Sequence, residues 1–190
     1  MEDAEKHISI CTSSITAVSE QQNTQSPKLY MIITNISKPA NIKSLLLAGG
    51  AFGCHAFFIV GQRKFNFSRH DDDNSSTSDL PRPLQHADIS ILIFDKLDDC
   101  VDHVRHNVNA KICGVEIVDS ALDVDAEPFF TNVNLCLMMG NEGTGLNARQ
   151  MQACDYFIRI RQFGGGTASL NVYVAASIVM QRFHQWSSRR

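Results

Sequence analysis

The sequence predicts an α/β fold: a mostly parallel sheet with helices on both faces. Two observations support this prediction. Short apolar segments alternate with segments of helical periodicity, and several apolar segments lack the polar alternation of a half-exposed strand. The chain has 190 residues, of which 44% are hydrophobic and 19% are charged. A chain of this length and composition has enough apolar mass for one domain with a buried core.

The expected elements follow a segment rich in Ser, Thr, Gln and Glu, which is expected to form a disordered polar tail at 1–27. The domain is expected to span 28–187, with a short C-terminal tail at 188–190. Apolar runs bounded by turn residues predict strands at 29–36, 56–61, 88–94, 112–118, 134–139 and 156–160. Helical spacing predicts helices at 41–52, 95–108, 146–154 and 170–186.

The first and last predicted helices have the clearest local signals. Asn41 is the predicted N-cap of the first helix, and Gly53 is its predicted stop. The last helix carries one apolar stripe, which predicts packing against the core or against a second subunit. The stripe consists of Val172, Ala175, Ala176, Val179, Phe183 and Trp186. The polar loop at 62–83, with three consecutive aspartates, is long enough to be functional or disordered.

The charge pattern limits the kinds of partner. A formal charge of −3 argues against a globally basic nucleic-acid-binding protein, but it leaves a local basic face open. Aspartates gather at 71–73 and 95–102, whereas arginines gather in the last third of the chain. These arginines include Arg149, Arg159, Arg161 and Arg182. No apolar stretch approaches the roughly 20 residues that cross a bilayer, and no secretory signal opens the chain. We expect no membrane partner and an intracellular location, in the cytoplasm or the nucleus.

The residues that commonly bind metals give no metal site. Six cysteines with irregular spacing and no C-x-x-C motif favour buried free thiols over disulfides or structural zinc. His103 and His106 share a predicted helix, where a solvated face explains them. The aspartates at 71–73 are typical of an acidic loop rather than of a divalent-ion site. We therefore expect no metal cofactor.

Two glycine-rich loops that follow predicted strands are the strongest candidates for chemistry. The loop at 140–146 reads Gly-Asn-Glu-Gly-Thr-Gly-Leu and places Glu142 among glycines that let a ligand approach the backbone. Its glycine order matches neither the dinucleotide fingerprint nor the Walker pattern. The loop at 164–171 ends in Ser169, Leu170 and Asn171 and leads into the last helix. Taken alone, the first loop is also explained by a tight turn. The second is also explained by a glycine hinge and an ordinary N-cap of the last helix, from Ser169 or Thr167.

Taken together, the two loops resemble the SPOUT superfamily, and more narrowly its TrmH (SpoU) branch of tRNA and rRNA ribose 2′-O-methyltransferases. The resemblance rests on 140–146, the strand end at Ile160, 169–172 and 175–176. It extends through Asn35, Asn41 and 51–53, and covers 29–186. It implies a deep C-terminal trefoil knot, a homodimer packed partly through the last helix, RNA as substrate and S-adenosylmethionine as cofactor.

The resemblance also implies the site residues. Gly140, Ile160 and Leu170 would contact the adenosyl group through their main chain. The expected cofactor-binding set is Leu137, Met138, Met139, Gly140, Asn141, Glu142, Gly143, Ile160, Gly165, Ser169, Leu170 and Asn171. The expected catalytic set is Glu142, Asn171, Ser169 and Asn35, together with Lys43, which is not part of the family pattern. Such a site would align a 2′-oxygen with the methyl carbon, which can contribute about 7–11 kcal/mol.

One position departs from the family pattern. The family carries an arginine on the first helix that handles the 2′-hydroxyl, whereas Leu47 stands at that position here. Lys43 lies one turn earlier on the same helix face, and it is either a replacement for the guanidinium or a surface lysine. A second explanation assigns the role of the family arginine to another arginine, from this chain or from a second subunit. The candidates are Arg63, Arg69, Arg82 and Arg161.

Two further interpretations stay open. The protein could bind RNA or cofactor without transferring a methyl group, because Leu47 replaces the family arginine. Alternatively, it could be an ordinary nucleotide-binding α/β protein whose glycine loops cradle phosphate. That second alternative predicts affinity for NAD or ATP and no preference for S-adenosylmethionine.

Overall fold

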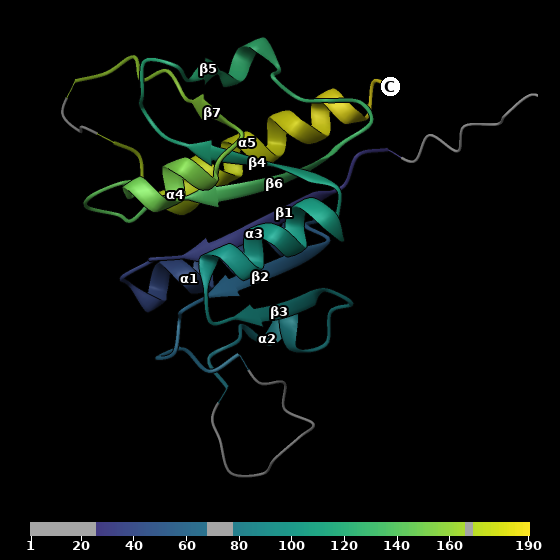
Figure 1. Ribbon diagram of the computed structural model, residues 1–190, viewed down its shortest axis with the longest axis vertical. Coiled ribbons are helices and arrows are strands. Elements are labelled where there is room, and N and C mark those ends of the chain that lie inside the picture. The colour runs from purple at the N-terminus through teal and green to yellow at the C-terminus, as the bar shows by residue number, and fades with distance from the viewer. Residues whose placement is uncertain (1–25, 68–77, 166–168) are drawn as a thin grey trace, which may run out of the picture.

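The computed structural model describes residues 26–67, 78–165 and 169–190 (Figure 1). Apart from Ser26 and Pro27, the predicted polar tail lies outside these residues, as do the aspartates at 71–73, Cys11, Arg69 and Thr167. The predicted tail and domain limits therefore stay predictions. In the described parts of the chain, every helix is too short or too polar to span a lipid bilayer.

Seven strands of the described residues form one sheet in the order β3-β2-β1-β6-β4-β7-β5, and every pairing is parallel. The strands are β1 (Leu29–Thr34), β2 (Ala56–Val60), β3 (Ser90–Phe94), β4 (Ala110–Val115), β5 (Leu122–Asp123), β6 (Asn134–Met139) and β7 (Tyr156–Arg159). The helices are α1 (Pro39–Ala51), α2 (Arg82–Gln85), α3 (Leu97–His106), α4 (Ala148–Ala153) and α5 (Val172–Ser187), with the short 3-10 helix η1 (Val124–Ala126). The predicted α/β class with a parallel sheet is confirmed.

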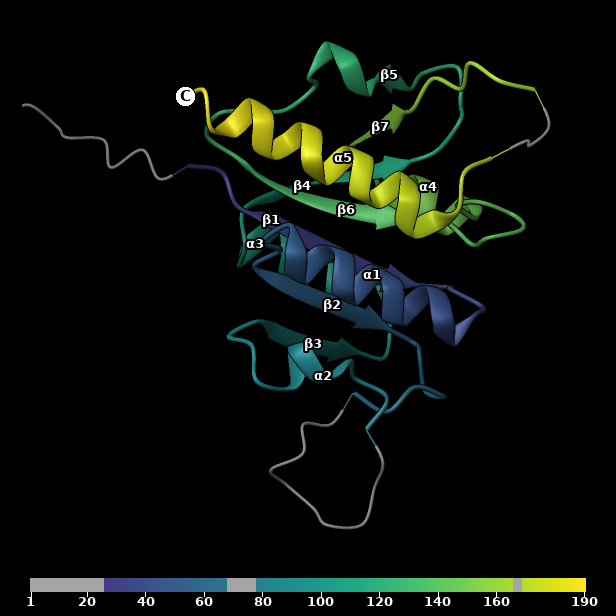
Figure 2. The same cartoon turned by 180° about the vertical axis from the view of Figure 1, so that it is seen from behind.

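Helices cover both faces of the sheet. Successive side chains of β1 point to opposite faces, and both sets are buried. Met31 and Ile33 point into a core shared with α1 and α5, whereas Ile32 points into a second core shared with α3. Figure 1 shows α3 and α4 on one face, and Figure 2 shows α1 and α5 side by side on the other. Because both faces are covered, β1, β2 and β6 are almost wholly buried.

The first helix begins earlier than predicted. Lys38 precedes it without a side-chain cap, and Pro39 occupies the first turn, where a missing N–H costs nothing. Asn41 is therefore a buried residue of the first turn and not the N-cap. The predicted stop is confirmed, because Gly53 follows the helix with a φ of 66° in the left-handed region.

The last helix confirms its predicted stripe and corrects its predicted cap. Of the stripe residues, Ala175 is partly buried and the other five are buried against the core. The N-cap is Asn171, whose side-chain oxygen accepts a hydrogen bond from the Tyr173 N–H at 3.0 Å. The sequence predicts Ser169 or Thr167 as this cap; Ser169 lies two residues before the observed N-cap, and Thr167 lies outside the described residues.

The short elements α2, β5 and η1 were not predicted. Each has four residues or fewer, which is too short for a periodic pattern to register. Strand β4 also ends at Val115, three residues before the predicted end. Glu116 and Ile117 therefore lie in a loop at the carboxyl edge of the sheet.

The five described cysteines confirm the prediction of free thiols, and all are free. Four of them are buried, and burial raises the pKa of Cys100 to about 12. Such a thiol stays protonated at neutral pH and is a poor nucleophile. Among the described residues, no group of three or more His, Cys, Asp or Glu is placed to hold a metal ion.

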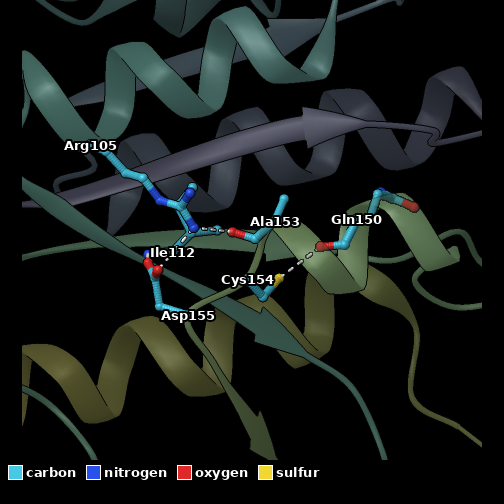
Figure 3. Close-up of polar contacts among 6 residues, drawn as sticks. All are labelled: Arg105, Ile112, Gln150, Ala153, Cys154 and Asp155. Carbon is cyan, nitrogen blue, oxygen red and sulfur yellow. Dashed lines mark hydrogen bonds and ion pairs between the residues drawn. The ribbon is translucent and has the colours of Figure 1, made fainter.

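Polar contacts at the α4–β7 junction fix the segment that precedes β7 (Figure 3). Arg105 of α3 donates hydrogen bonds to the Ala153 carbonyl at 3.0 Å and to Asp155 Oδ1 at 2.9 Å. Asp155 Oδ2 in turn accepts from the Ile112 N–H of β4 at 2.7 Å. These contacts join α3, α4 and β4, and so hold β7 in register beside β4.

Candidate functional site

A cavity of about 350 Å³, here called the glycine-loop cavity, lies at the carboxyl edge of the sheet. The volume falls within the usual range for small-ligand sites. The ends of β4 and β6 and the start of α5 surround it. Seven of its lining residues were predicted from the sequence: Met139, Gly140, Asn141, Glu142, Gly143, Ser169 and Leu170. The two glycine-rich loops therefore meet at one cavity, as the sequence predicts.

The loop at 140–146 is a closed turn held by its own backbone. Asn141 and Gly145 exchange two backbone hydrogen bonds of 2.9 Å, and Asn141 Oδ1 accepts from the Gly143 N–H at 2.9 Å. Gly145 has a φ of 68°, and a Cβ on Gly140 would lie 2.5 Å from the Gly145 carbonyl carbon. These two glycines are thus required by the turn itself, before any ligand is considered.

Glu142 ties this turn to the loop after β1. Its two carboxylate oxygens accept from the backbone N–H groups of Ser37 and Lys38, each at 3.0 Å. Oε1 also accepts from Asn41 Nδ2 at 2.7 Å. Partial burial alone would raise the pKa of Glu142, but the hydrogen bonds from Asn41 and the backbone together outweigh it and hold the pKa below its usual value. Glu142 is thus an ionised group engaged in structural contacts.

Asn171 joins the same network from the other glycine-rich loop. Its Nδ2 donates to Asn41 Oδ1 at 3.3 Å, so Asn41 links Asn171 to Glu142. Asn141 adds a parallel link, because its Nδ2 donates to the Asn35 carbonyl at 2.9 Å and to Ser37 Oγ at 2.6 Å. The loops after β1 and β6 and the start of α5 are therefore joined into one hydrogen-bonded unit.

Other predicted site residues lie elsewhere. Leu137 and Met138 are fully buried within β6 and do not line the cavity, and Gly165 is exposed with no atom near its Cβ position. Ile160 lines a smaller cavity that shares Ser169 and Leu170 with the first. Lys43 points away from the Glu142 network, because its ammonium lies 3.4 Å from Asp79 Oδ1.

Asn35 lies at the edge of the network, in a strained position. Its φ of 56° is in the left-handed region, which asparagine tolerates better than most residues. Its Nδ2 donates a long hydrogen bond of 3.5 Å to the buried Gln150 Oε1 of α4. Asn35 thus contacts the site through its carbonyl, while its side chain points toward α4.

Sequence reasoning missed the wall that the end of β4 forms. Val115, Glu116 and Ile117 line the cavity, and Glu116 Oε2 accepts from the Leu146 N–H at 2.8 Å. A Cβ on Gly145 would lie 2.3 Å from that same oxygen, so the glycine makes room for the carboxylate. The available signal was the carboxylate of Glu116 next to a strand end. The predicted strand at 112–118 ran past this residue, so Glu116 was not recognised as part of a loop.

The sequence leaves a local basic face open in the last third, but the four arginines that suggested it are paired. Each pairs with an aspartate: Arg149 with Asp98, Arg159 and Arg161 with Asp123, and Arg182 with Asp125. Hydrogen bonds from Arg161 and Arg159 lower the pKa of Asp123 to about 2, so this pairing persists at any physiological pH. These arginines are therefore engaged with carboxylates and do not form a free basic surface.

Comparison with known proteins gives relatives that are named as tRNA/rRNA methyltransferases. A protein of Mycobacterium ulcerans named as an uncharacterized tRNA/rRNA methyltransferase is 26% identical over 156 residues, covering 81% of this chain and 46% of its own length. The chain thus spans about half the length of such curated relatives.

Two solved structures share the fold. The SpoU methyltransferase AviRb from Streptomyces viridochromogenes matches with a TM-score of 0.67 and 20% identity, over 88% of this chain and 62% of that one. The AdoMet-bound rRNA methyltransferase from Sinorhizobium meliloti matches with a TM-score of 0.64 and 18% identity, over 86% and 58% of the two chains. The SpoU rRNA methylase family matches residues 28–181, which is most of the chain. The chain therefore belongs to the SpoU rRNA methylase family.

Proposed function

We propose that this chain transfers a methyl group from S-adenosylmethionine to a ribose 2′-hydroxyl of tRNA or rRNA. The observation that carries the proposal is one cavity, bounded by both glycine-rich loops, in a chain of the SpoU family. A family member that binds without transferring, and a protein that binds NAD or ATP, are the alternatives. We further propose that the reaction takes place inside the cell.

The chemistry of the cavity walls fits S-adenosylmethionine. Val115, Ile117 and Leu170 offer apolar surface for an adenine ring, and the turn at 140–145 presents backbone groups at close range. Glu116 adds a carboxylate that suits hydroxyl or ammonium donors. Gly140 and Leu170 in this cavity, and Ile160 in the adjoining one, would hold the adenosyl group. When bound, this cofactor supplies a methyl group that is already activated for transfer.

Glu142 serves this reaction better as a positioning residue than as a general base. A carboxylate with three hydrogen bonds and a lowered pKa has little tendency to take a proton. Its network instead fixes the loop after β1 against the cavity, and Asn171 holds the start of α5 to the same network. Because alignment can contribute about 7–11 kcal/mol, while general acid–base catalysis adds about 10²–10⁴-fold, alignment is the larger requirement.

The position of the missing family arginine remains apolar. Leu47 is 42% exposed and lies on the outer face of α1, so this helix offers no guanidinium there. Of the candidate replacements, Arg161 pairs with Asp123 and Lys43 pairs with Asp79. Arg82, on helix α2, lines neither the glycine-loop cavity nor the cavity formed by residues 35–65, and we set it aside. Catalysis in this proposal therefore depends on alignment, and a slower transfer than in arginine-bearing relatives is expected.

The proposal includes a homodimer and a C-terminal trefoil knot. Support for the dimer is the exposed apolar surface at Leu47 of α1 and Tyr173 of α5, on adjacent helices. Support for the knot is the return of α5 to the α1 side of the sheet after β7, together with family membership. Sedimentation equilibrium tests the dimer, and the residual contour length under mechanical extension tests the knot.

The deciding experiment separates binding from transfer. Calorimetry with S-adenosylhomocysteine, NAD and ATP measures which ligand the cavity takes. Labelled methyl transfer to tRNA and rRNA, followed by nucleoside analysis, then identifies 2′-O-methylated products. Binding of S-adenosylhomocysteine together with 2′-O-methyl nucleosides supports the proposal. Binding without transfer to any RNA favours the non-catalytic alternative, and preference for NAD or ATP rejects the cofactor assignment.

A further inference from the structure

A second cavity, of about 420 Å³, lies beside the first at the carboxyl edge of the sheet. Here it is called the β2-loop cavity, because the segment after β2 forms one wall and the loop after β1 forms the other. Its polar and flexible lining residues are Asn35, Ser37, Gly61, Gln62, Arg63 and Lys64. None of them comes from the glycine-rich loops, and the volume is sufficient for a nucleotide-sized ligand.

A single loop separates the two cavities. Strand β1 lies between β2 and β6 in the sheet, so the loop after β1 lies between the loops that follow those strands. On the side of the glycine-loop cavity, Glu142 accepts from the Ser37 N–H. On the other side, in the amide orientation that satisfies both groups, the Gln62 side-chain oxygen accepts from the Asn35 N–H at 3.2 Å and the Ile36 N–H at 3.0 Å. A ligand in either cavity would therefore contact the same wall.

The β2-loop cavity is cationic and its cations are available. Arg63 has an ion pair with Asp95 at 3.6 Å, with the two side chains 82% and 83% exposed. An exposed pair of that length contributes little, so an incoming anion can displace Asp95. Lys64 is exposed and forms no ion pair with any residue in the described parts of the chain. This contrasts with Arg159 and Arg161, which share the largely buried carboxylate of Asp123.

We propose that the β2-loop cavity binds an RNA nucleotide that neighbours the one accepting the methyl group, and that Arg63 and Lys64 hold the adjoining backbone phosphates. A guanidinium can bind phosphate through two parallel hydrogen bonds, and an ammonium adds a point charge. A nucleotide held there would lie against the loop at 35–38, so the next nucleotide of the strand could cross that loop and enter the methyl-donor cavity. This inference rests on the proposed function and assigns its RNA-binding residues.

The test compares a double variant, Arg63→Gln with Lys64→Gln, with the control Arg82→Gln. Arg82 is an exposed cation of the neighbouring helix α2 and does not line the cavity. RNA binding of unmodified tRNA and of rRNA fragments is measured across a salt series, alongside S-adenosylhomocysteine binding and methyl transfer. We expect the double variant to lose at least tenfold in RNA affinity and to raise KM for RNA. Its salt slope should fall by about 1.4, since each lost phosphate contact on a single strand removes about 0.7.

The remaining readouts separate this inference from a folding defect and from the proposed function. Thermal unfolding and S-adenosylhomocysteine binding should be unchanged in the double variant. The single variant Arg63→Lys, which keeps the positive charge, should retain part of the RNA affinity that the double variant loses. If the wild type transfers no methyl group but the double variant still loses RNA affinity and salt slope, the proposed function fails and the RNA site stands. Equal losses in Arg82→Gln, loss of S-adenosylhomocysteine binding, or unaltered RNA binding in the double variant would overturn the inference.

Discussion

The glycine-loop cavity and the β2-loop cavity share the loop at 35–38, yet their walls are built differently. On the glycine-loop side, the polar groups of Asn141 and Glu142 are hydrogen-bonded to the shared loop, to Asn41 of α1 or to the turn itself. On the β2 side, the cations Arg63 and Lys64 project from the loop, with one long ion pair between them and the described protein. One wall is fixed before any ligand arrives, and the other carries charge that has not been neutralised.

This difference suits two kinds of ligand. A preformed cavity avoids the cost of ordering its walls when a small molecule of fixed shape binds. Exposed cations are typical of a surface for a polyanion, whose affinity comes largely from released counterions. The molecule therefore separates rigidity from charge, and each side can be altered without the other.

The largest expected effect comes from Gly140→Ala, which tests the rigidity of the glycine-loop side. The new Cβ would lie 2.5 Å from the Gly145 carbonyl carbon, so the backbone of the turn must move. We expect a loss of about 3 kcal/mol in the free energy of unfolding and a fall in Tm of about 6–12 °C. S-adenosylhomocysteine affinity, measured by calorimetry, should fall more than tenfold.

Gly164→Ala is the matched control for that change. No atom lies within 4 Å of the corresponding Cβ position, so stability and ligand binding should stay close to those of the wild type. RNA affinity at low salt should also be retained in a folded Gly140→Ala protein, because Arg63 and Lys64 lie on the other side of the shared loop. A stable Gly140→Ala protein with normal ligand affinity would show that the turn is not rigid.

Glu142→Gln tests the shared wall and has a smaller expected effect. The amide keeps one acceptor oxygen but turns an NH₂ group toward a backbone N–H of the loop after β1. Because hydrogen bonds to a charged group contribute about 1.5–3 kcal/mol and this group is partly exposed, we expect a loss of about 1–2 kcal/mol. Chemical unfolding measures it, and kcat should fall more than S-adenosylhomocysteine affinity.

The pH dependence of that stability difference has a defined sign. The pKa of Glu142 is lower in the folded protein than in the unfolded chain, so the carboxylate stabilises the fold above the ordinary glutamate pKa of about 4.3. That stabilisation is lost as the pH falls through the folded pKa. The advantage of the wild type over Glu142→Gln should therefore be full at pH 7 and shrink below about pH 4. If the difference in free energy of unfolding between the wild type and Glu142→Gln does not change with pH, the charge of Glu142 does not contribute to that difference.

The sequence predicts those parts of the molecule that depend on neighbours along the chain. Strand β6 was predicted with its observed bounds, Asn134–Met139, because an apolar run lies between a polar residue and a glycine. The turn at 140–146 was predicted as a ligand loop because its glycines and Glu142 are contiguous. Pro39 indicates the earlier start of α1, because proline is favoured in the first turn of a helix. Without that signal, Asn41 was the predicted N-cap.

The remainder of the site depends on contacts between distant segments. Asn41 links Glu142 and Asn171, which are 101 and 130 residues away, and no local pattern contains that relation. The pairing of Arg159 and Arg161 with Asp123 likewise spans 36 and 38 residues, so a basic face that the sequence allowed is neutralised in the fold. Strand β4 ends at Val115, which pairs with the last residue of β6, Met139, and not where its apolar run ends. The longer predicted strand therefore concealed Glu116.

The smallest expected effect, from Asp95→Asn, sharpens the contrast in charge. Asp95 is the carboxylate that competes for Arg63, at 3.6 Å and with both side chains exposed. Its removal should raise RNA affinity about two- to threefold at low salt, because a weak surface pair no longer has to be broken. The gain should vanish in an Arg63→Gln background and at high salt, while S-adenosylhomocysteine affinity stays constant. If Asp95→Asn still raises RNA affinity in the Arg63→Gln background, then Asp95 repels RNA directly. That outcome would contradict the proposal that Asp95 competes with RNA for the Arg63 guanidinium.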